Sequence, residues 1–256
     1  METTYGKLAN NPTRGTRTSP KITYHPSPDE EEEREPRDFF DAMMRDDESV
    51  DDMVCDEPNL VFTIQKFLAL ATAGLLLFGL ALGTIIQLAQ PIVLMGFPLE
   101  GTPIVWVPLA LTGGFLSAIA IGLPSFYFYT QLSGLDASFR LVTAQSLRVQ
   151  ARTSTILLGL LPFYIAFSLM PFTGLAASEM CLETVIAVGI SLPFIVGFAG
   201  LLSIYTSFRR LVKRLPITHP RRGDIMLRLV LCWGAVAVCV APVAIFRIAE
   251  YLSAII

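Results

Sequence analysis

Charged residues are scarce in this sequence. They make up 16% of the 256 residues, whereas a soluble domain is typically about a quarter charged. Hydrophobic residues make up 53%. This balance excludes a soluble globular enzyme, a secreted disulfide scaffold and an ordinary nucleic-acid-binding protein, so we expect no nucleic-acid partner.

Histidine and cysteine are also sparse, and their positions exclude several kinds of chemistry. The two histidines, His25 and His219, lie outside the long apolar runs, and the four cysteines form no C-x-x-C pair. A histidine zinc site or a Ser–His pair inside a bilayer is therefore excluded. The sequence also lacks a glycine-rich phosphate loop. We expect no catalytic residue, no metal ligand and no cofactor, and hence a protein that is not an enzyme.

Long apolar runs dominate the chain after residue 60. A run of about 18 or more apolar residues is long enough to form a spanning helix. Five such runs are present, at about 67–88, 104–131, 155–177, 183–208 and 226–246. The sequence predicts an all-α integral membrane protein, with a five-helix transmembrane bundle over residues 61–256.

The first 60 residues have the opposite character. They hold sixteen of the 22 acidic residues and seven of the 19 basic ones, which gives this segment a net charge of −9. The stretch Pro26–Glu35 reads PSPDEEEERE. Low hydrophobicity with high net charge leaves too little apolar area to offset the chain entropy of folding. We therefore predict a disordered acidic tail over residues 1–60.

One apolar patch interrupts this tail. It consists of Phe39, Phe40, Met43 and Met44. In a helix, Phe40, Met43 and Met44 share one face because they stand at i, i+3 and i+4. One hypothesis is a docking peptide that folds into the groove of a cytoplasmic protein partner. The alternative is a helical turn that lies on the protein's own surface or on the bilayer.

Basic residues alternate between the predicted loops. The loop between spans two and three carries Arg140, Arg148 and Arg152, whereas the loops at 89–103 and 177–182 have neither Lys nor Arg. Short cytoplasmic loops are enriched in Lys and Arg. The pattern places the N-terminus in the cytoplasm and the C-terminus on the opposite side. The membrane would be the inner membrane of a bacterium or an endomembrane of a eukaryote.

The loop between spans four and five is the most basic segment. Its cations are Arg209, Arg210, Lys213, Arg214, Arg221 and Arg222. They could contact anionic lipid headgroups, since each Lys or Arg near such a surface contributes about 1 kcal/mol. The simpler interpretation is that they only fix the orientation. On the far side, Arg247 stands three residues before Glu250, a spacing that favours a helical ion pair.

Small residues and prolines mark the spans. Gly79 and Gly83 form a G-x-x-x-G motif, and Gly114, Ala118 and Gly122 continue the small-residue pattern in the second span. This favours close packing within the bundle or in a homo-oligomer. Spans two to five also contain prolines, at positions 108, 124, 162, 171, 193 and 242. They are typical either of kinked packing helices or of the broken helices around a transporter's solute site.

The arrangement resembles the Yip1-like membrane domain. The local similarity is GLDASFR at Gly134–Arg140, then a proline-bearing apolar stretch at Leu158–Phe167, and later SFRR at Ser207–Arg210. The resemblance implies five spans behind a polar cytoplasmic segment, and a non-catalytic membrane organiser or adaptor. It assigns no functional residue.

Two functions follow as hypotheses. The first is a non-enzymatic membrane adaptor or assembly subunit that recruits a cytoplasmic partner through its tail, by way of the patch at Phe39–Met44. The second is a small-solute transporter or channel with proline-broken helices. In both, the lipid bilayer surrounds the bundle.

Overall fold

The computed structural model describes most of the region after residue 38. The residues described are 39–45, 48–56, 58–90, 93–94, 97–98, 101–132, 137–173, 182–198, 234–235 and 239–255. The chain divides into two units, residues 1–37 and 38–256, and every described residue belongs to the second unit.

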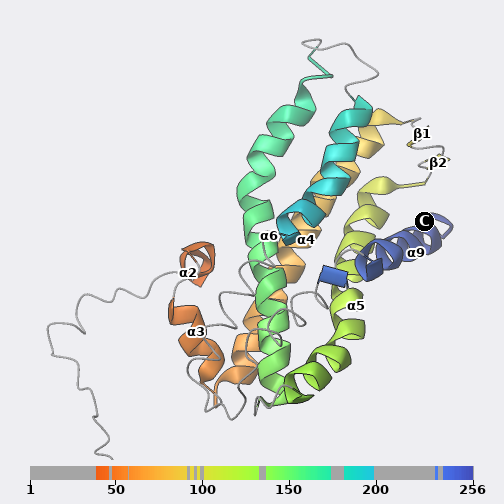
Figure 1. The fold of residues 1–256 in the computed structure, drawn as a ribbon. Coiled ribbons are helices and arrows are strands. Elements are labelled where there is room, and N and C mark those ends of the chain that lie inside the picture. The colour runs from red at the N-terminus through yellow and green to blue at the C-terminus, as the bar shows by residue number, and fades with distance from the viewer. Residues whose placement is uncertain are drawn as a thin grey trace, which may run out of the picture. The chain divides into compact units, whose positions relative to one another are not determined.

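Three long helices form the centre of this unit (Figure 1). They are α4 (Leu60–Ala89), α5 (Pro103–Leu132) and α6 (Phe139–Leu169), of 30, 30 and 31 residues. Each is long and apolar enough to cross a membrane, because about 20 residues cover the hydrocarbon core. The predicted helical membrane protein is confirmed to this extent. The first two predicted spans fall within α4 and α5, whereas the third, predicted at 155–177, lies in α6 only as far as Leu169.

Two shorter helices correspond to the last predicted spans. The helix Leu182–Phe198 covers the first part of the span predicted at 183–208. Helix α9 (Ala241–Ser253) covers the end of the span predicted at 226–246 and continues beyond it. The remaining parts of both predicted spans lie almost wholly outside the described residues.

The three long helices alternate in direction. Gly79 of α4 lies against Pro108 of α5, and Gly83 lies against Pro103, so these two helices are antiparallel. Helix α6 returns alongside α4, with Ser154 against Gly74. We call the end where α4 and α6 begin the Leu60 end, and the other the Ala89 end. Near the Ala89 end, β1 (Val93–Leu94) and β2 (Phe97–Pro98) form a short antiparallel pair between α4 and α5.

Glycines set the distance between the helices. A Cβ atom at Gly79 would lie 2.6 Å from the Cα of Pro108, and one at Gly83 would lie 2.5 Å from the carbonyl oxygen of Pro103. Only glycine allows the two backbones to come this close. The sequence left open whether this motif packs within the bundle or between copies, and here it packs within the bundle.

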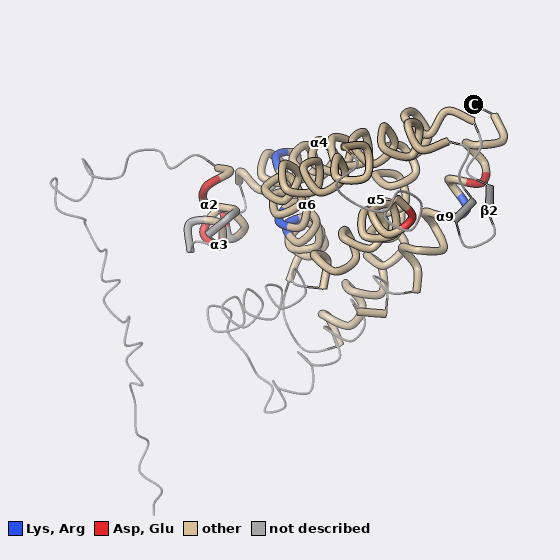
Figure 2. Tube along the Cα trace, turned by 90° about the horizontal axis from the view of Figure 1, so that it is seen from above, with Lys and Arg blue, Asp and Glu red and all other residues tan. Residues whose placement is uncertain are grey.

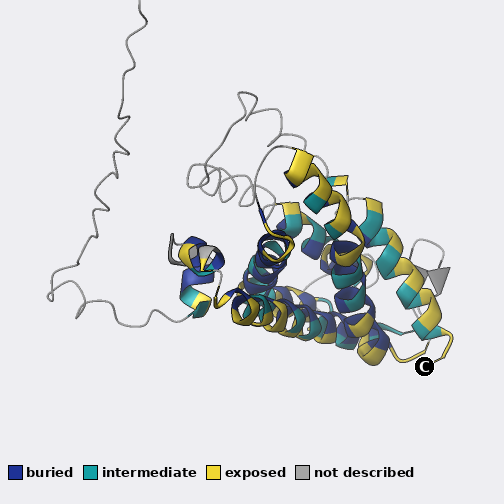
Figure 3. Ribbon diagram, turned by 90° about the horizontal axis from the view of Figure 1, so that it is seen from below, coloured by how far each residue is buried: buried dark blue, intermediate teal, exposed yellow. Residues whose placement is uncertain are grey.

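The buried side chains form two clusters along the bundle. One lies toward the Leu60 end and contains Phe67 and Phe126, and the other lies toward the Ala89 end and contains Phe78 and Trp106. Figure 3 shows the buried residues on the inward faces of the helices and the exposed ones outside. Large exposed apolar side chains such as Phe163 and Ile121 cover the outside, as expected of helices that face lipid.

The structure differs from the predicted tail over residues 39–55. Helix α2 (Phe39–Arg45) and helix α3 (Glu48–Cys55) occupy this segment and pack against α4 and α6. The prediction of disorder rested on the net charge of the first 60 residues. That charge does not reflect the few apolar positions that make this packing favourable. Residues 1–38 lie outside the described residues.

The structure also differs from the loop predicted before span three. Helix α6 begins at Phe139, so Arg140, Arg148 and Arg152 are helical. The hydroxyl of Ser138 caps the helix by accepting a hydrogen bond from the backbone N–H of Leu141 at 3.3 Å. Hydropathy alone placed the start of the span later, because the first turns of α6 are polar.

Candidate functional site

Helices α2 and α3 form a cap on the Leu60 end of the bundle. The ring of Phe39 stacks on that of Phe67 in α4, with centroids 5.7 Å apart. Met43 is 2% exposed, and Val50 and Val54 are fully buried in the same cluster. The ammonium of Lys66 lies 5.6 Å from the centre of the Phe39 ring. The cap is therefore joined to the bundle by an apolar face of its own.

A buried ion pair links the cap to α6. A guanidinium nitrogen of Arg148 donates a hydrogen bond to a carboxylate oxygen of Asp51 in α3. Their side chains are only 4% and 5% exposed. Charged groups are rarely buried unless they are paired. The pair fixes which residues of α3 face α6, in addition to the non-directional apolar contacts.

The residues of the predicted partner-binding patch differ in how far they are exposed. Met43 faces inward, Phe39 is half-buried against Phe67, and Phe40 is 38% exposed. The side chain of Met44 lies outside the described residues. In the docked cap, therefore, Phe40 is the described member of the patch that a partner can reach best.

The first half of α6 carries a series of buried polar side chains. Ser154 donates a hydrogen bond to the carbonyl oxygen of Ala71 in α4 at 3.0 Å. The Nε2 atoms of Gln145 and Gln150 and the Oγ1 atom of Thr153 are buried without a hydrogen-bond partner. Polar side chains at such positions often mark an ordered water or a functional path. Hydropathy does not predict these buried side chains, because it places residues 132–154 in the loop between the second and third predicted spans.

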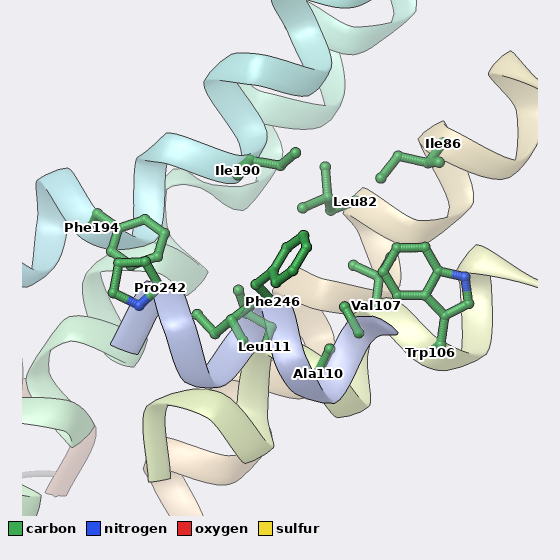
Figure 4. A pocket seen from close by; sticks show the side chains of 12 residues that line it. Leu82, Ile86, Trp106, Val107, Ala110, Leu111, Ile190, Phe194, Pro242 and Phe246 are labelled. Atoms are coloured by element: carbon green, nitrogen blue, oxygen red, sulfur yellow. The ribbon is translucent and has the colours of Figure 1, made fainter. Parts of the chain in front are cut away.

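An apolar cavity lies near the Ala89 end. It has a volume of about 270 Å³ and lies between α4, α5, α9 and the helix Leu182–Phe198 (Figure 4). Among the side chains of its described lining, the indole nitrogen of Trp106 is the one atom that is not carbon. The residues that line it are Leu82, Ile86, Trp106, Val107, Ala110, Leu111, Ile190, Phe194, Pro242, Ile245, Phe246 and Ala249.

The remaining predicted sites have different outcomes. The basic cluster Arg209–Arg222 lies outside the described residues, so its contact with lipid headgroups stays a prediction. The predicted pair within α9 is confirmed, with Nη1 of Arg247 2.8 Å from Oε2 of Glu250. Within the part of the chain that the structure describes, no group of three or more His, Cys, Asp or Glu side chains is placed to hold a metal ion.

Comparison of the chain with protein-family models, with curated proteins and with solved structures finds no match.

Proposed function

We propose that this chain is a non-enzymatic multi-pass membrane protein, with five spans and a cytoplasmic N-terminus, that acts as an adaptor or assembly subunit. Its N-terminal segment would recruit a cytoplasmic protein partner. The supporting observation is the docked cap with its buried Asp51–Arg148 pair. A segment held in this way presents a defined surface, and it transmits the binding of a partner to α6. The Yip1-like resemblance leads to the same expectation of a membrane organiser.

The distribution of charge supports a cytoplasmic Leu60 end. Among the described residues of the three long helices, the cations are Lys66, Arg140, Arg148 and Arg152, and all lie in the parts of α4 and α6 nearest that end (Figure 2). Cytoplasmic ends of spans are enriched in such residues.

The lengths of the helices support the same position for the cap. A hydrocarbon core about 30 Å thick needs about 20 residues, whereas α4 and α6 have 30 and 31. About ten residues of each helix therefore extend beyond the hydrocarbon. The cap packs on residues of α4 and α6 in their first ten positions, including Phe67 and Arg148. The cap would then lie at the membrane surface, where a soluble partner can reach it.

The exposed side of the cap suggests the chemistry of the partner. Phe40 is exposed, and so are the acidic residues Asp52 and Asp56 nearby in the sequence. Aromatic side chains are common energetic anchors of interfaces, while surrounding charges mainly steer the encounter. We propose a partner that offers an apolar pocket bordered by basic side chains.

The test is affinity purification of the detergent-solubilised chain from its own cells. The Phe40→Ala variant is expected to lose a specific co-purifying protein that the unaltered chain retains. Phe163→Ala is the matched control, because Phe163 is 73% exposed on α6 but is far along the helix from the cap. Equal recovery of every co-purifying protein with both variants would rule out recruitment through Phe40.

A small-solute transporter or channel is the second candidate. The observation that favours it is the set of buried, unpartnered polar atoms at Gln145, Gln150 and Thr153 on α6. In a cysteine-free background, a transporter with a water-filled path would let a small hydrophilic thiol reagent label Thr153→Cys. The control is Leu157→Cys, one turn away and fully buried among apolar residues. Absence of labelling at position 153 would argue against such a path.

A further inference from the structure

The cavity near the Ala89 end has a buried wall on α5 and partly exposed lining residues on two other helices. Trp106, Val107 and Ala110 of α5 are each less than 9% exposed. By contrast, Ile190 is 37% exposed and Phe246 is 52% exposed. Figure 4 shows Ile190 and Phe246 on different helices, both at the cavity. The cavity therefore opens between α9 and the helix Leu182–Phe198.

The position of the cavity along the helices supports a location inside the bilayer. Leu82 and Ile86 stand seven and three residues before the end of α4 at Ala89. With a rise of 1.5 Å per residue, these side chains lie within about 12 Å of that end. The spans predicted from hydropathy end at residue 88 and begin again at 104. The opening thus faces the lipid acyl chains near their headgroups, in the leaflet at the Ala89 end.

The chemistry of the lining selects an apolar occupant. Among the described residues that line the cavity, none is charged, and Trp106 supplies the one side-chain polar atom. A water molecule needs two to four polar partners, so this site does not favour water. An apolar cavity of about 150 Å³ already binds benzene, and this one has about 270 Å³. It has room for part of an extended hydrocarbon chain and offers nothing that recognises a charged headgroup.

We propose that this cavity is a binding site for one acyl chain of a bilayer phospholipid. The chain enters between α9 and the helix Leu182–Phe198 and packs against Leu82, Val107 and Ala110. The glycerol and headgroup remain outside, toward the Ala89 end. Because the recognised part is the hydrocarbon, phospholipids with different headgroups and the same chains bind equally well.

Tryptophan fluorescence provides the test. The chain has two tryptophans, so Trp233→Phe leaves Trp106 in the cavity wall as the single reporter. The full-length protein in detergent is titrated with phosphatidylcholine that carries one dibrominated acyl chain, since bromine quenches indole fluorescence on contact. Saturable quenching is expected. Quenching that rises linearly with lipid would mean partition into the micelle only, and would overturn the proposal.

Filling the cavity provides the specific control. Ala110→Phe occupies the space of the acyl chain and is expected to abolish saturable quenching. Ala120→Phe introduces the same side chain at an exposed position of the same helix and is expected to leave it unchanged. Equal effects of both variants would overturn the proposal.

Two further measurements test the same site if Ala110→Phe does not fold. Val107→Phe fills the cavity from the adjacent turn of α5 and must also abolish saturable quenching. Replacing phosphatidylcholine with phosphatidylglycerol that carries the same brominated chain must leave the half-saturation concentration within about twofold. A strong dependence on the headgroup, or saturable quenching that survives in a folded Val107→Phe protein, would overturn the site.

Discussion

Asp51 and Arg148 are 97 residues apart in the sequence and form a buried ion pair between two helices. Asp51 belongs to α3 of the cap, and Arg148 belongs to the first half of α6. A buried pair is weak evidence for stability, because removing two charges from water offsets most of their attraction. Loss of one partner is different, since it leaves the other charge buried without the opposite charge in direct contact with it.

The single variants Asp51→Leu and Arg148→Met should therefore each destabilise the docked cap, by about 3–5 kcal/mol. The double variant should cost much less than the sum, because it removes both buried charges together. The measurement is the rate of trypsin cleavage after Arg45, which lies at the end of α2. Glu250→Gln, which breaks the exposed pair with Arg247, should change stability by less than about 1 kcal/mol. Additive single effects would contradict direct pairing.

The contact between α4 and α5 should be intolerant of a methyl group at Gly79. The added Cβ would meet the backbone of Pro108 at 2.6 Å, so Gly79→Ala should destabilise the bundle by about 1–3 kcal/mol. Gly197 is the matched control, because no atom lies within 4 Å of a Cβ placed there. Gly197→Ala should be neutral or stabilise by up to about 1 kcal/mol. Thermal unfolding in detergent, followed by circular dichroism, measures both variants.

The hydrogen bond between α6 and α4 should contribute modestly. Ser154→Ala removes the donor to the carbonyl of Ala71, and such bonds in membrane bundles are worth about 0.6 kcal/mol. Ser191→Ala is the control, because Ser191 bonds within its own helix, to the carbonyl oxygen of Val188. Ser154→Leu should be far more disruptive, since Gly74 leaves no room for a larger side chain. Equal stability of the alanine and leucine variants would show that the two helices are not closely packed there.

The orientation can be tested by labelling in intact cells. In a cysteine-free background, Thr102→Cys at the Ala89 end should react with a membrane-impermeant thiol reagent, whereas Pro58→Cys at the Leu60 end should react only after permeabilisation. Both positions are exposed. The reverse pattern would place the N-terminus outside the cytoplasm. Labelling of both in intact cells would mean that α4 does not cross the membrane.

The sequence predicts the apolar parts of this fold well, because hydropathy is a local property. The predicted span at 104–131 differs from α5 by one residue at each end, and the span at 67–88 ends one residue before α4 does. At the polar ends the same criterion fails. Helix α4 begins seven residues earlier than predicted and α6 sixteen residues earlier, because their first turns are stabilised by the cap rather than by lipid.

The cap itself shows why the rest could not be predicted. The spacing of Phe40 and Met43 correctly indicates a helix, but whether its apolar face meets a partner or the protein's own bundle depends on α4 and α6. In the sequence, Arg148 looks like any basic loop residue that fixes the orientation of the chain. Its burial depends on Asp51, which lies 97 positions away. The cavity is likewise formed by four helices that are distant in the sequence.

The separation of Asp51 and Arg148 in the sequence also affects the order of events during synthesis. A ribosome adds about 5–20 residues per second, so Arg148 is made about 5–20 s after Asp51. During that interval the carboxylate of Asp51 lacks Arg148, and the inner face of the cap lacks α6 to pack on. The buried pair therefore forms only after the first half of α6 has been made. A chain that ends before residue 148 lacks this contact, and its cap is held by fewer contacts than the cap of the finished chain.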